Sequence, residues 1–482
     1  MKSLETAKTE IQGLKRRTFL RNSSLGLGAL SLGLLLDRTA SELRASSTDA
    51  SGVLKTTHYP AKAKNIIFLF MAGGPSHVDL FDPKPKLREL DGSPIPEHLL
   101  KDHQQFALIR GEPALKGSTF KFKRHGASGA VLSELLPHLS TVADDLCIIR
   151  SMKTSTNIHD PGVNMMNCGT TNFGRPTLGA WLSYGLGSES ADLPSYVVMT
   201  SGADDGQPLL QSFWGSGFLD SRHQGVPFLQ GREPVLHLKN PKGVTSRQRK
   251  DQLDLLRQMN REHHKKIGDP EILSRLAAYE MAFRMQASVP ELTDLKSESE
   301  STLRDYGVDV AQPSFARNCL LARRLVERGV RFVQLFDRGW DSHTDIQKEH
   351  RRQCVASDQS IAALVRDLKQ RGLLDETLII WGGEFGRTPV AQISGATYGR
   401  DHHPHAFTMW LAGGGVPAGM TIGETDDFGY HTTDNTVHVR DLHATILRLM
   451  GIDHERFKYH LKGLDLGLTG VEPARILPEI VS

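Results

Sequence analysis

The chain has 482 residues, with 58 Lys+Arg against 55 Asp+Glu and a formal net charge of +3. This balance excludes a strongly basic nucleic-acid-binding protein, and the length with only four cysteines excludes a small disulfide-stabilised scaffold. Apolar residues make up 39% and charged residues 23%, as in ordinary globular proteins. The 21 histidines, many of them near acidic residues, make metal chemistry a hypothesis to test.

The N-terminus has the pattern of an export leader. An arginine pair precedes Phe-Leu, and an apolar run rich in Gly and Leu follows over 25–36. This order resembles a twin-arginine signal, and the run is shorter than the roughly 20 apolar residues that a membrane span needs. We therefore predict a signal peptide over 1–45, a periplasmic or otherwise exported protein, and no stable membrane span. The alternative is a basic amphipathic N-terminus.

The exported chain is expected to be nearly neutral. Residues 46–482 carry 50 basic and 51 acidic residues, a net charge of −1, so any attraction to a polyanion must be local. We predict no nucleic-acid partner. The four cysteines lie far apart without C-x-x-C spacing, which indicates neither a zinc ribbon nor a disulfide framework.

Apolar runs and helical patterns alternate along residues 63–482, which we predict to form one large α/β domain after a mobile linker over 46–62. Short continuous apolar runs indicate strands buried on both faces of a sheet. These runs cover 65–71, 146–149, 196–199, 330–336, 378–381 and 407–411. Helical patterns at 314–328 and 360–370 each end at a glycine before such a run, which is typical of a largely parallel sheet flanked by helices.

The segment 201–295 breaks this rhythm, and we predict it to be an insertion. Its part 201–245 is rich in Gly and Pro and indicates an irregular loop, whose aromatic residues Phe213, Trp214 and Phe218 look exposed and would cover a cleft. The part 247–290 has a polar to amphipathic helical pattern.

Histidines and carboxylates gather near the predicted strand ends, where loops converge in α/β sheets. Asp341 and His343 follow one strand and are two residues apart, so in extended backbone they share a face. A carboxylate with an imidazole suits Zn²⁺, Mn²⁺ or Fe better than Ca²⁺. The alternative is an Asp that caps a turn beside a solvated His.

Two later segments add candidate ligands. Asp401 is followed by His402, His403 and His405, a set that fits a cation or a substrate anion but does not show which ring points inward. Glu384 directly follows an apolar strand, so its charge needs a partner, either a metal or the nearby arginine at 387.

Earlier loops carry weaker candidates. His77 and Asp79 follow Gly-Gly-Pro-Ser and would support the ligands by hydrogen bonds, or would simply belong to a tight turn. His159 precedes the start of a predicted helix, where anions are favoured, and the alternative is a plain capping neighbourhood.

Four motifs together resemble a known family. They are Gly-Gly-Pro-Ser-His-Val-Asp-Leu-Phe-Asp-Pro-Lys-Pro over 73–85, Trp-Asp-Ser-His over 340–343, Gly-Glu-Phe-Gly-Arg-Thr-Pro over 383–389 and Gly-Arg-Asp-His-His-Pro over 399–404. Over nearly the whole exported chain the sequence resembles domain-of-unknown-function family 1501. That family is similar to the alkaline phosphatase and sulfatase superfamily, whose members hydrolyse phosphate or sulfate esters at one-metal or two-metal sites.

The resemblance implies a sulfatase-like or alkaline-phosphatase-like sandwich that hydrolyses anionic esters of small molecules or glycans with a divalent metal, Zn, Mn or Fe. The metal ligands would be Asp341, His343, Glu384 and His402, completed by Asp401, His403 or His405. Arg387 and Arg400 would neutralise the developing oxyanion, and His159 would act as nucleophile or as proton donor.

The sequence departs from the superfamily at Ala72 and Phe385, which stand where it has an Asp and a His, and no Ser, Thr or Cys stands at the nucleophile position. A non-catalytic binding or scaffold protein of the envelope is therefore the second hypothesis. A phosphomutase-like isomerase is the third, and it is disfavoured because exported enzymes rarely meet phosphorylated metabolites.

Overall fold

The computed structural model describes residues 52–100, 113–202, 209–231, 233–236, 238–269, 271–394 and 396–481. The predicted signal peptide over 1–45 lies outside the described residues. The described chain forms two compact units, one over 231–291 and the other made of 52–230 together with 292–481. No helix in the described ranges is long and apolar enough to cross a membrane.

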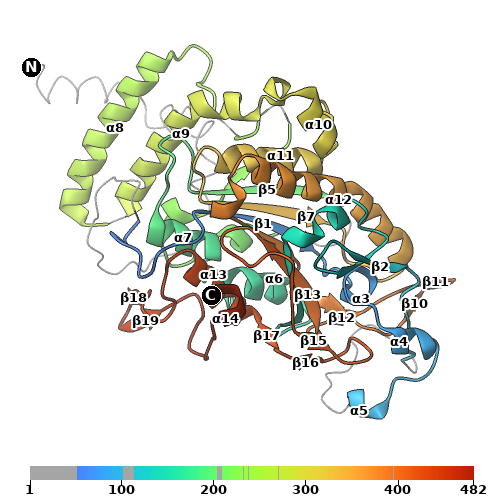
Figure 1. Cartoon of the computed structure of the whole chain (residues 1–482). Coiled ribbons are helices and arrows are strands. Elements are labelled where there is room, and N and C mark those ends of the chain that lie inside the picture. Colours follow the sequence, from blue (N-terminus) through green and yellow to red (C-terminus); the bar gives the residue numbers. More distant parts are fainter. Residues whose placement is uncertain are drawn as a thin grey trace, which may run out of the picture. The chain divides into compact units, whose positions relative to one another are not determined.

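The larger unit is built around a nine-stranded sheet (Figure 1). Its strands in spatial order are β14 (Met420–Ile422), β4 (Leu146–Lys153), β13 (Phe407–Ala412), β8 (Thr377–Gly382), β1 (Asn65–Ala72), β7 (Phe332–Arg338), β5 (Tyr196–Gly202) and β6 (Val226–Phe228), and β17 (Val437–His438) also pairs with β4. All pairings from β8 to β6 are parallel, whereas β13 is antiparallel to β8 and to β4. The prediction of a largely parallel sheet is confirmed.

Helices cover both faces of this sheet (Figure 1), so strand β1 is buried along its whole length. Its residues Ile66, Phe68 and Phe70 share one hydrophobic core with helices α6, α7 and α13, while α11 packs against the opposite face. The helices of this unit are α3 (His77–Leu80), α4 (Pro85–Glu89), α5 (Glu97–Leu100), α6 (His159–Cys168), α7 (Leu178–Leu186), α10 (Glu300–Tyr306), α11 (Phe315–Val326), α12 (Ile346–Gln370), α13 (Val439–Leu449) and α14 (Pro478–Val481). The prediction of a sheet flanked by helices is thus confirmed.

The antiparallel direction of β13 brings the chemistry to one edge of the sheet. Trp410 pairs with Trp381, so the start of β13 lies beside the carboxyl end of β8. The residues before β13 therefore meet the loops that follow β1, β7 and β8. Strand β4 is antiparallel to β13, so its carboxyl end reaches the same edge.

Short two-stranded ribbons complete the larger unit. They are β2 (Phe122–His125) with β3 (Ala130–Ser133), β9 (Gly386–Arg387) with β12 (His402–His403), β10 (Gln392–Ser394) with β11 (Thr397–Gly399), β15 (Glu424–Thr425) with β16 (Thr432–Asp434), and β18 (Tyr459–Leu461) with β19 (Leu464–Leu466). The smaller unit contains helix α8 (Ser246–Ile267) and most of α9 (Glu271–Thr293).

Three expectations from the sequence are wrong in part. Strand β6 lies within the predicted loop 201–245, and its Pro227 is tolerated because β6 is an edge strand. Phe213 and Trp214, which look exposed in the sequence, are buried in the core. The predicted mobile linker is tied down where it is described, because Val53 and Tyr59 donate backbone hydrogen bonds to Tyr184 and Gly451.

Candidate metal centre

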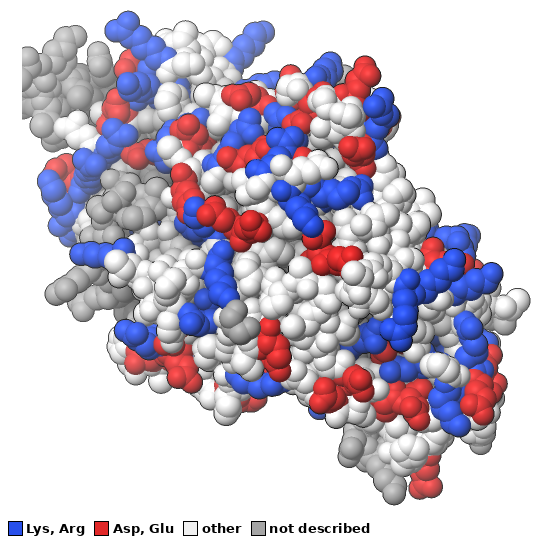
Figure 2. Space-filling model, viewed as in Figure 1, with Lys and Arg blue, Asp and Glu red and all other residues white. Residues whose placement is uncertain are grey.

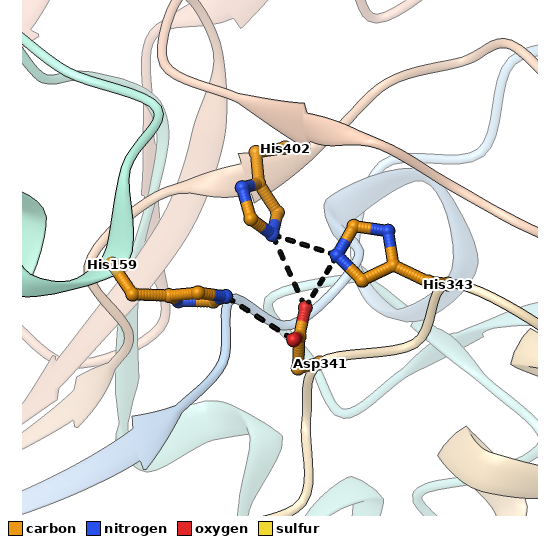
Figure 3. A group of neighbouring side chains, drawn as sticks. All are labelled: His159, Asp341, His343 and His402. Carbon is orange, nitrogen blue, oxygen red and sulfur yellow. Dashed lines mark hydrogen bonds and ion pairs between the residues drawn. The ribbon is translucent and has the colours of Figure 1, made fainter. Parts of the chain in front are cut away.

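Four side chains from three separate segments meet at the edge of the sheet and form what we call the metal cluster: His159, Asp341, His343 and His402 (Figure 3). One ligand-type atom of each lies within 4.8 Å of all the others. The side chains are between 10% and 23% exposed, so the cluster is reached by solvent. Among the described residues, no other group of three or more His, Cys, Asp or Glu has such spacing.

Local backbone structure brings these residues together. His159 is the first residue of α6, and Asp341 and His343 lie in the loop after β7. Gly73 has a φ of 122°, and a Cβ there would lie 2.4 Å from the backbone nitrogen of Asp341. Likewise, a Cβ at Gly399 would lie 2.1 Å from the carbonyl carbon of His343. The loop carrying Asp341 and His343 therefore depends on two glycines.

Asp341 stands at the centre of the cluster. Its Oδ1 lies 2.8 Å from Nε2 of His343 and 3.1 Å from Nε2 of His402. Its Oδ2 lies 3.2 Å from Nε2 of His159. All three rings thus direct the same nitrogen at one carboxylate.

The other nitrogen of each ring is held from behind. Nδ1 of His159 lies 2.7 Å from Oε1 of Glu384, and Nδ1 of His343 lies 2.7 Å from Oε1 of Gln392. Nδ1 of His402 lies 2.7 Å from the carbonyl oxygen of Asn157. A carbonyl or carboxylate oxygen can only accept, so each Nδ1 carries a proton. A ring that is neutral then turns the lone pair of Nε2 inward, whereas a protonated ring presents an N–H there.

This arrangement suits a cation at its centre, beside the guanidinium of Arg387, whose Nη2 lies 2.5 Å from Oδ1 of Asp341 and whose Nη1 lies 3.4 Å from Nε2 of His343. Nε2 of His343 and Nε2 of His402 are only 2.9 Å apart. Two lone pairs at this distance repel each other and also repel the carboxylate of Asp341 unless a proton or a metal lies between them. Imidazole nitrogens with one carboxylate are donors that divalent Zn, Mn and Fe accept. The residues present therefore fit a divalent metal.

The environment of the cluster favours the charged forms of Asp341 and His159 and the neutral form of His402. Burial opposes ionisation of Asp341, but hydrogen bonds from His159, His343 and His402 hold its pKa far below the usual range. Burial also lowers the pKa of His159, yet its hydrogen bonds to Asp341 and Glu384 raise the pKa overall, to about 9. The pKa of His402 is lowered to about 4, chiefly by burial. The cluster thus combines an ionised Asp341 carboxylate with a His159 ring that stays protonated at neutral pH.

Glu384 and Arg387 lie around the cluster in roles other than those predicted. Glu384 is fully buried, accepts a hydrogen bond from the backbone of Gly73 and contacts Nδ1 of His159, so its place is behind a ring and not among the ligand atoms. Arg387 is also fully buried and donates to Asp341 at 2.5 Å and to the carbonyl of Gly74. Its guanidinium orients Asp341 and is not presented to solvent.

Arg400 and Asp79 form a separate buried pair. Nε of Arg400 lies 2.7 Å from Oδ2 of Asp79, and both side chains are fully buried. Arg400 also donates to the carbonyls of Lys116 and Thr388, so its hydrogen-bonding groups are directed at protein atoms. The predicted oxyanion contact by Arg400 is thus not seen in this arrangement.

The remaining predicted residues lie outside the cluster. His77 and His403 belong with His405 and His431 to what we call the outer histidine group, whose neighbouring rings lie between 5.5 and 6.4 Å apart. Nε2 of His77 contacts the carbonyl of Gly429, and the Asp401 carboxylate accepts from the backbone nitrogen of residue 402. The structure therefore does not bring Asp401, His403 or His405 together with the ligand atoms.

Gln392 and Asn157 contribute to the cluster, and sequence reasoning missed both. Gln392 lies on the short strand β10, within no recognisable motif, and Asn157 acts through its main-chain carbonyl, which any residue type would supply. Neither contact leaves a signal in a single sequence.

Comparisons with known proteins give one extensive match. A family model described as "Protein of unknown function (DUF1501)" matches residues 63–481. A search of curated proteins gives no match. Similar solved structures include the PsFucS1 sulfatase from Pseudoalteromonas sp., at 14% identity over 82% of this chain and 68% of that chain with a TM-score of 0.34. Another is the C-terminal periplasmic domain of EcEptC from Escherichia coli in complex with Zn, at 7% identity over 83% and 86% with a TM-score of 0.35. Such similarities assign no activity to this chain.

Proposed function

The chain belongs to the DUF1501 family of proteins of unknown function, and we propose that it is an exported, metal-dependent hydrolase of anionic esters. The substrate class is sulfate or phosphate esters, including those carried by glycans. One observation carries the proposal: three imidazoles held at Nδ1 turn Nε2 toward a single ionised carboxylate at a solvent-reached edge of the sheet. The motifs that resemble the sulfatase and alkaline phosphatase superfamily supply the reaction class.

In this proposal Asp341, His343 and His402 hold the metal, because their ligand atoms lie within 3.1 Å of one another. A divalent metal bound there would polarise the ester oxygen and lower the pKa of a water molecule. Arg387 fixes the orientation of the Asp341 carboxylate through its 2.5 Å contact. Gln392 and the Asn157 carbonyl fix the tautomers of the two rings.

His159 is the proton donor of the proposed reaction. Its Nε2 contacts Oδ2 of Asp341, whereas the other two rings contact Oδ1, so it stands at the side of the ligand set. A pKa of about 9 keeps a proton on this ring at neutral pH. The water oxygen bonds to the sulfur or phosphorus atom, the bond to the ester oxygen breaks, and that oxygen takes the proton from His159. The proton that the water molecule loses returns to His159. The net reaction is ester plus water to alcohol plus acid.

Metal analysis of variants tests the ligand assignment. The wild-type chain should carry about one equivalent of Zn, Mn or Fe, since the described residues offer one cluster. Asp341→Ala and His402→Ala should lose this metal. His159→Ala should keep the metal and lose turnover; loss of metal as well would make His159 a fourth ligand. Glu384→Gln serves as the control for metal content, because it keeps the shape of the Glu384 side chain and removes only the negative charge beside Nδ1 of His159.

An ester screen tests the reaction class. Metal-loaded wild type would be assayed with 4-nitrophenyl sulfate, 4-nitrophenyl phosphate and a phosphodiester, beside Asp341→Ala as the inactive control. Turnover of a sulfate or phosphate ester that Asp341→Ala lacks supports the proposal. A folded, metal-free wild type without turnover would refute it and favour the binding or scaffold protein. Export is tested separately, by finding whether replacing the arginine pair in 1–45 keeps the protein in the cytoplasm.

A further inference from the structure

Helix α8 carries a dense basic segment on a chain that is otherwise acidic. Residues 239–266 contain nine Lys+Arg and three Asp+Glu, a net charge of +6. The rest of 46–482 contains 41 basic and 48 acidic residues, a net charge of −7. Figure 2 shows Lys and Arg side chains gathered along α8, at the left of the view. Such an asymmetry creates a local positive potential that attracts polyanions.

The basic side chains form a stripe along the helix. At 3.6 residues per turn, Arg247, Lys250, Arg261 and Lys265 fall within about 60° of one another and extend over about 27 Å. All four are exposed. Arg247, Lys250 and Arg261 make no ion pair with any residue in the described part of the chain. We refer to these four residues as the α8 stripe.

Three acidic residues of α8 lie near this stripe, and the exposed Asp251, about 40° from Arg247 around the helix, offsets part of its charge. Helix α8 still carries seven Lys+Arg against three Asp+Glu. Asp254 lies on the same side of the helix, but Nη1 of Arg257 binds its carboxylate at 2.8 Å. Glu262 lies 2.9 Å from Nζ of Lys265, an exposed pair that contributes little to stability and can exchange partners. The capping box at Thr245 and Gln248 fixes the start of the helix, so the stripe is presented on a defined surface.

We propose that the α8 stripe is a docking surface for a linear anionic polysaccharide, the polymer that carries the esters hydrolysed at the metal cluster. The identification of the docked polymer as the substrate rests on the proposed function, whereas its binding to α8 does not. A linear polymer with repeated anionic groups matches an elongated row of cations.

Two other occupants fit the stripe less well. A bilayer would need apolar residues among the basic ones, but the exposed Leu255 and Met259 lie about 80° and 120° around the helix from Arg247. A single-stranded nucleic acid held by base stacking would need aromatic side chains, and α8 contains no Phe, Tyr or Trp. Duplex DNA would bind through its phosphates alone, so tighter binding of duplex DNA than of dextran sulfate would overturn the assignment of the occupant.

Binding of dextran sulfate to the full chain tests the docking surface, with unsulfated dextran as the neutral polymer. The triple variant Arg247→Gln, Lys250→Gln, Arg261→Gln keeps good helix formers and should bind dextran sulfate about tenfold or more weakly. Its slope of log affinity against log salt should fall by about two to three. The matched control removes three exposed cations in and just before strand β2, by Lys121→Gln, Lys123→Gln and Arg124→Gln, and should bind like wild type.

Each other outcome overturns the docking proposal. An equal loss in the two triple variants would mean general charge attraction, and equally tight binding of polyglutamate would exclude selection of a polysaccharide. Tighter binding to phosphatidylglycerol vesicles than to dextran sulfate would identify a lipid surface instead.

Two further variants separate this inference from the proposed function. Asp341→Asn should bind dextran sulfate normally, because the change lies outside α8. In the α8 triple variant, KM for a sulfated polysaccharide should rise about tenfold, while KM for 4-nitrophenyl sulfate stays constant. If no ester is turned over but α8 still binds the polymer selectively, the proposed function fails and the docking surface stands. A KM that rises equally for both substrates would contradict the link between them.

Discussion

The metal cluster and the outer histidine group each receive one residue from the same short strand, β12. His402 and His403 are neighbours on β12, so their side chains point to opposite sides of the ribbon. In the metal cluster, Nδ1 of each ring faces an acceptor and Nε2 faces the common centre. In the outer histidine group, Nε2 of His403 contacts the carbonyl of Tyr430, and Nε2 of His77 contacts that of Gly429.

The difference shows that the acceptor behind a ring decides what a histidine can do. A ring whose Nε2 donates to a main-chain carbonyl has only Nδ1 left for a metal, and among the described residues the Nδ1 atoms of the outer histidine group do not converge with other ligand atoms as the Nε2 atoms of the metal cluster do. The hydrogen bonds of His77 and His403 to the carbonyls of Gly429 and Tyr430 hold the loop over 426–431 in place. A ring anchored through Nδ1 keeps Nε2 for a ligand. A count of histidines in the sequence therefore overstates the number of metal ligands.

The largest expected effect concerns the metal cluster. His402→Ala removes one of three ligands, so the chain should lose its metal entirely, because the two remaining donors cannot hold it against water. Elemental analysis of purified protein measures this. His402→Ala protein that still carries one equivalent would contradict the ligand assignment.

Next in size is the effect of removing an acceptor from behind a ring. Gln392→Ala should weaken metal affinity by about 10-fold to 100-fold, because Nδ1 of His343 loses the partner that fixes its tautomer. Gln392→Glu restores an acceptor and should bind the metal at least as tightly as wild type. Competition with a chelator of known affinity measures both. Equal affinity in the wild type and both variants would show that Gln392 does not position His343.

The sequence predicts part of this site because some of its causes are local. Asp341 and His343 stand two residues apart after a buried strand, so donor type and position at a strand end predict them. The choice of His402 among its neighbours comes from the family resemblance. Glu384 was placed in the right neighbourhood, but its partner is a ring from α6, far away in sequence.

The rest of the site depends on side-chain direction. The sequence does not reveal that His403 points away from His402, because the direction of β12 is set by its pairing with β9. Arg387 and Arg400 look available as cations in the sequence. Only the fold shows that main-chain carbonyls and buried carboxylates surround them.

A smaller effect is expected from a change in the outer histidine group. His403→Ala should leave the metal content near one equivalent and lower the free energy of unfolding by about 1–3 kcal/mol. The variant leaves the Tyr430 carbonyl without its ring partner and creates a small cavity. Urea denaturation with metal analysis of the same sample measures both quantities. Loss of metal with unchanged stability would reverse the assignments of the two histidines.

The last effect concerns two carboxylates that are close in sequence, Asp337 near the end of β7 and Asp341 in the loop that follows. The pKa of Asp341 is lowered by its basic neighbours, whereas burial raises that of Asp337 to about 6, although Ser201 and Trp340 donate to it. Between pH 4 and pH 6 the folded chain therefore holds a proton at Asp337 that the unfolded chain has released. The free energy of unfolding should fall by up to about 3 kcal/mol as pH rises through this range.

Asp337→Asn removes this dependence and keeps a similar shape. Its stability relative to wild type should rise from pH 4 to pH 7, with a net gain of about 1 kcal/mol at pH 7 once the weaker hydrogen bonds are included. Urea denaturation in the presence of a chelator excludes any contribution from metal binding. A difference between variant and wild type that stays constant across this pH range would mean that Asp337 is ionised throughout. The contrast with Asp341 would then disappear, because both carboxylates would be ionised.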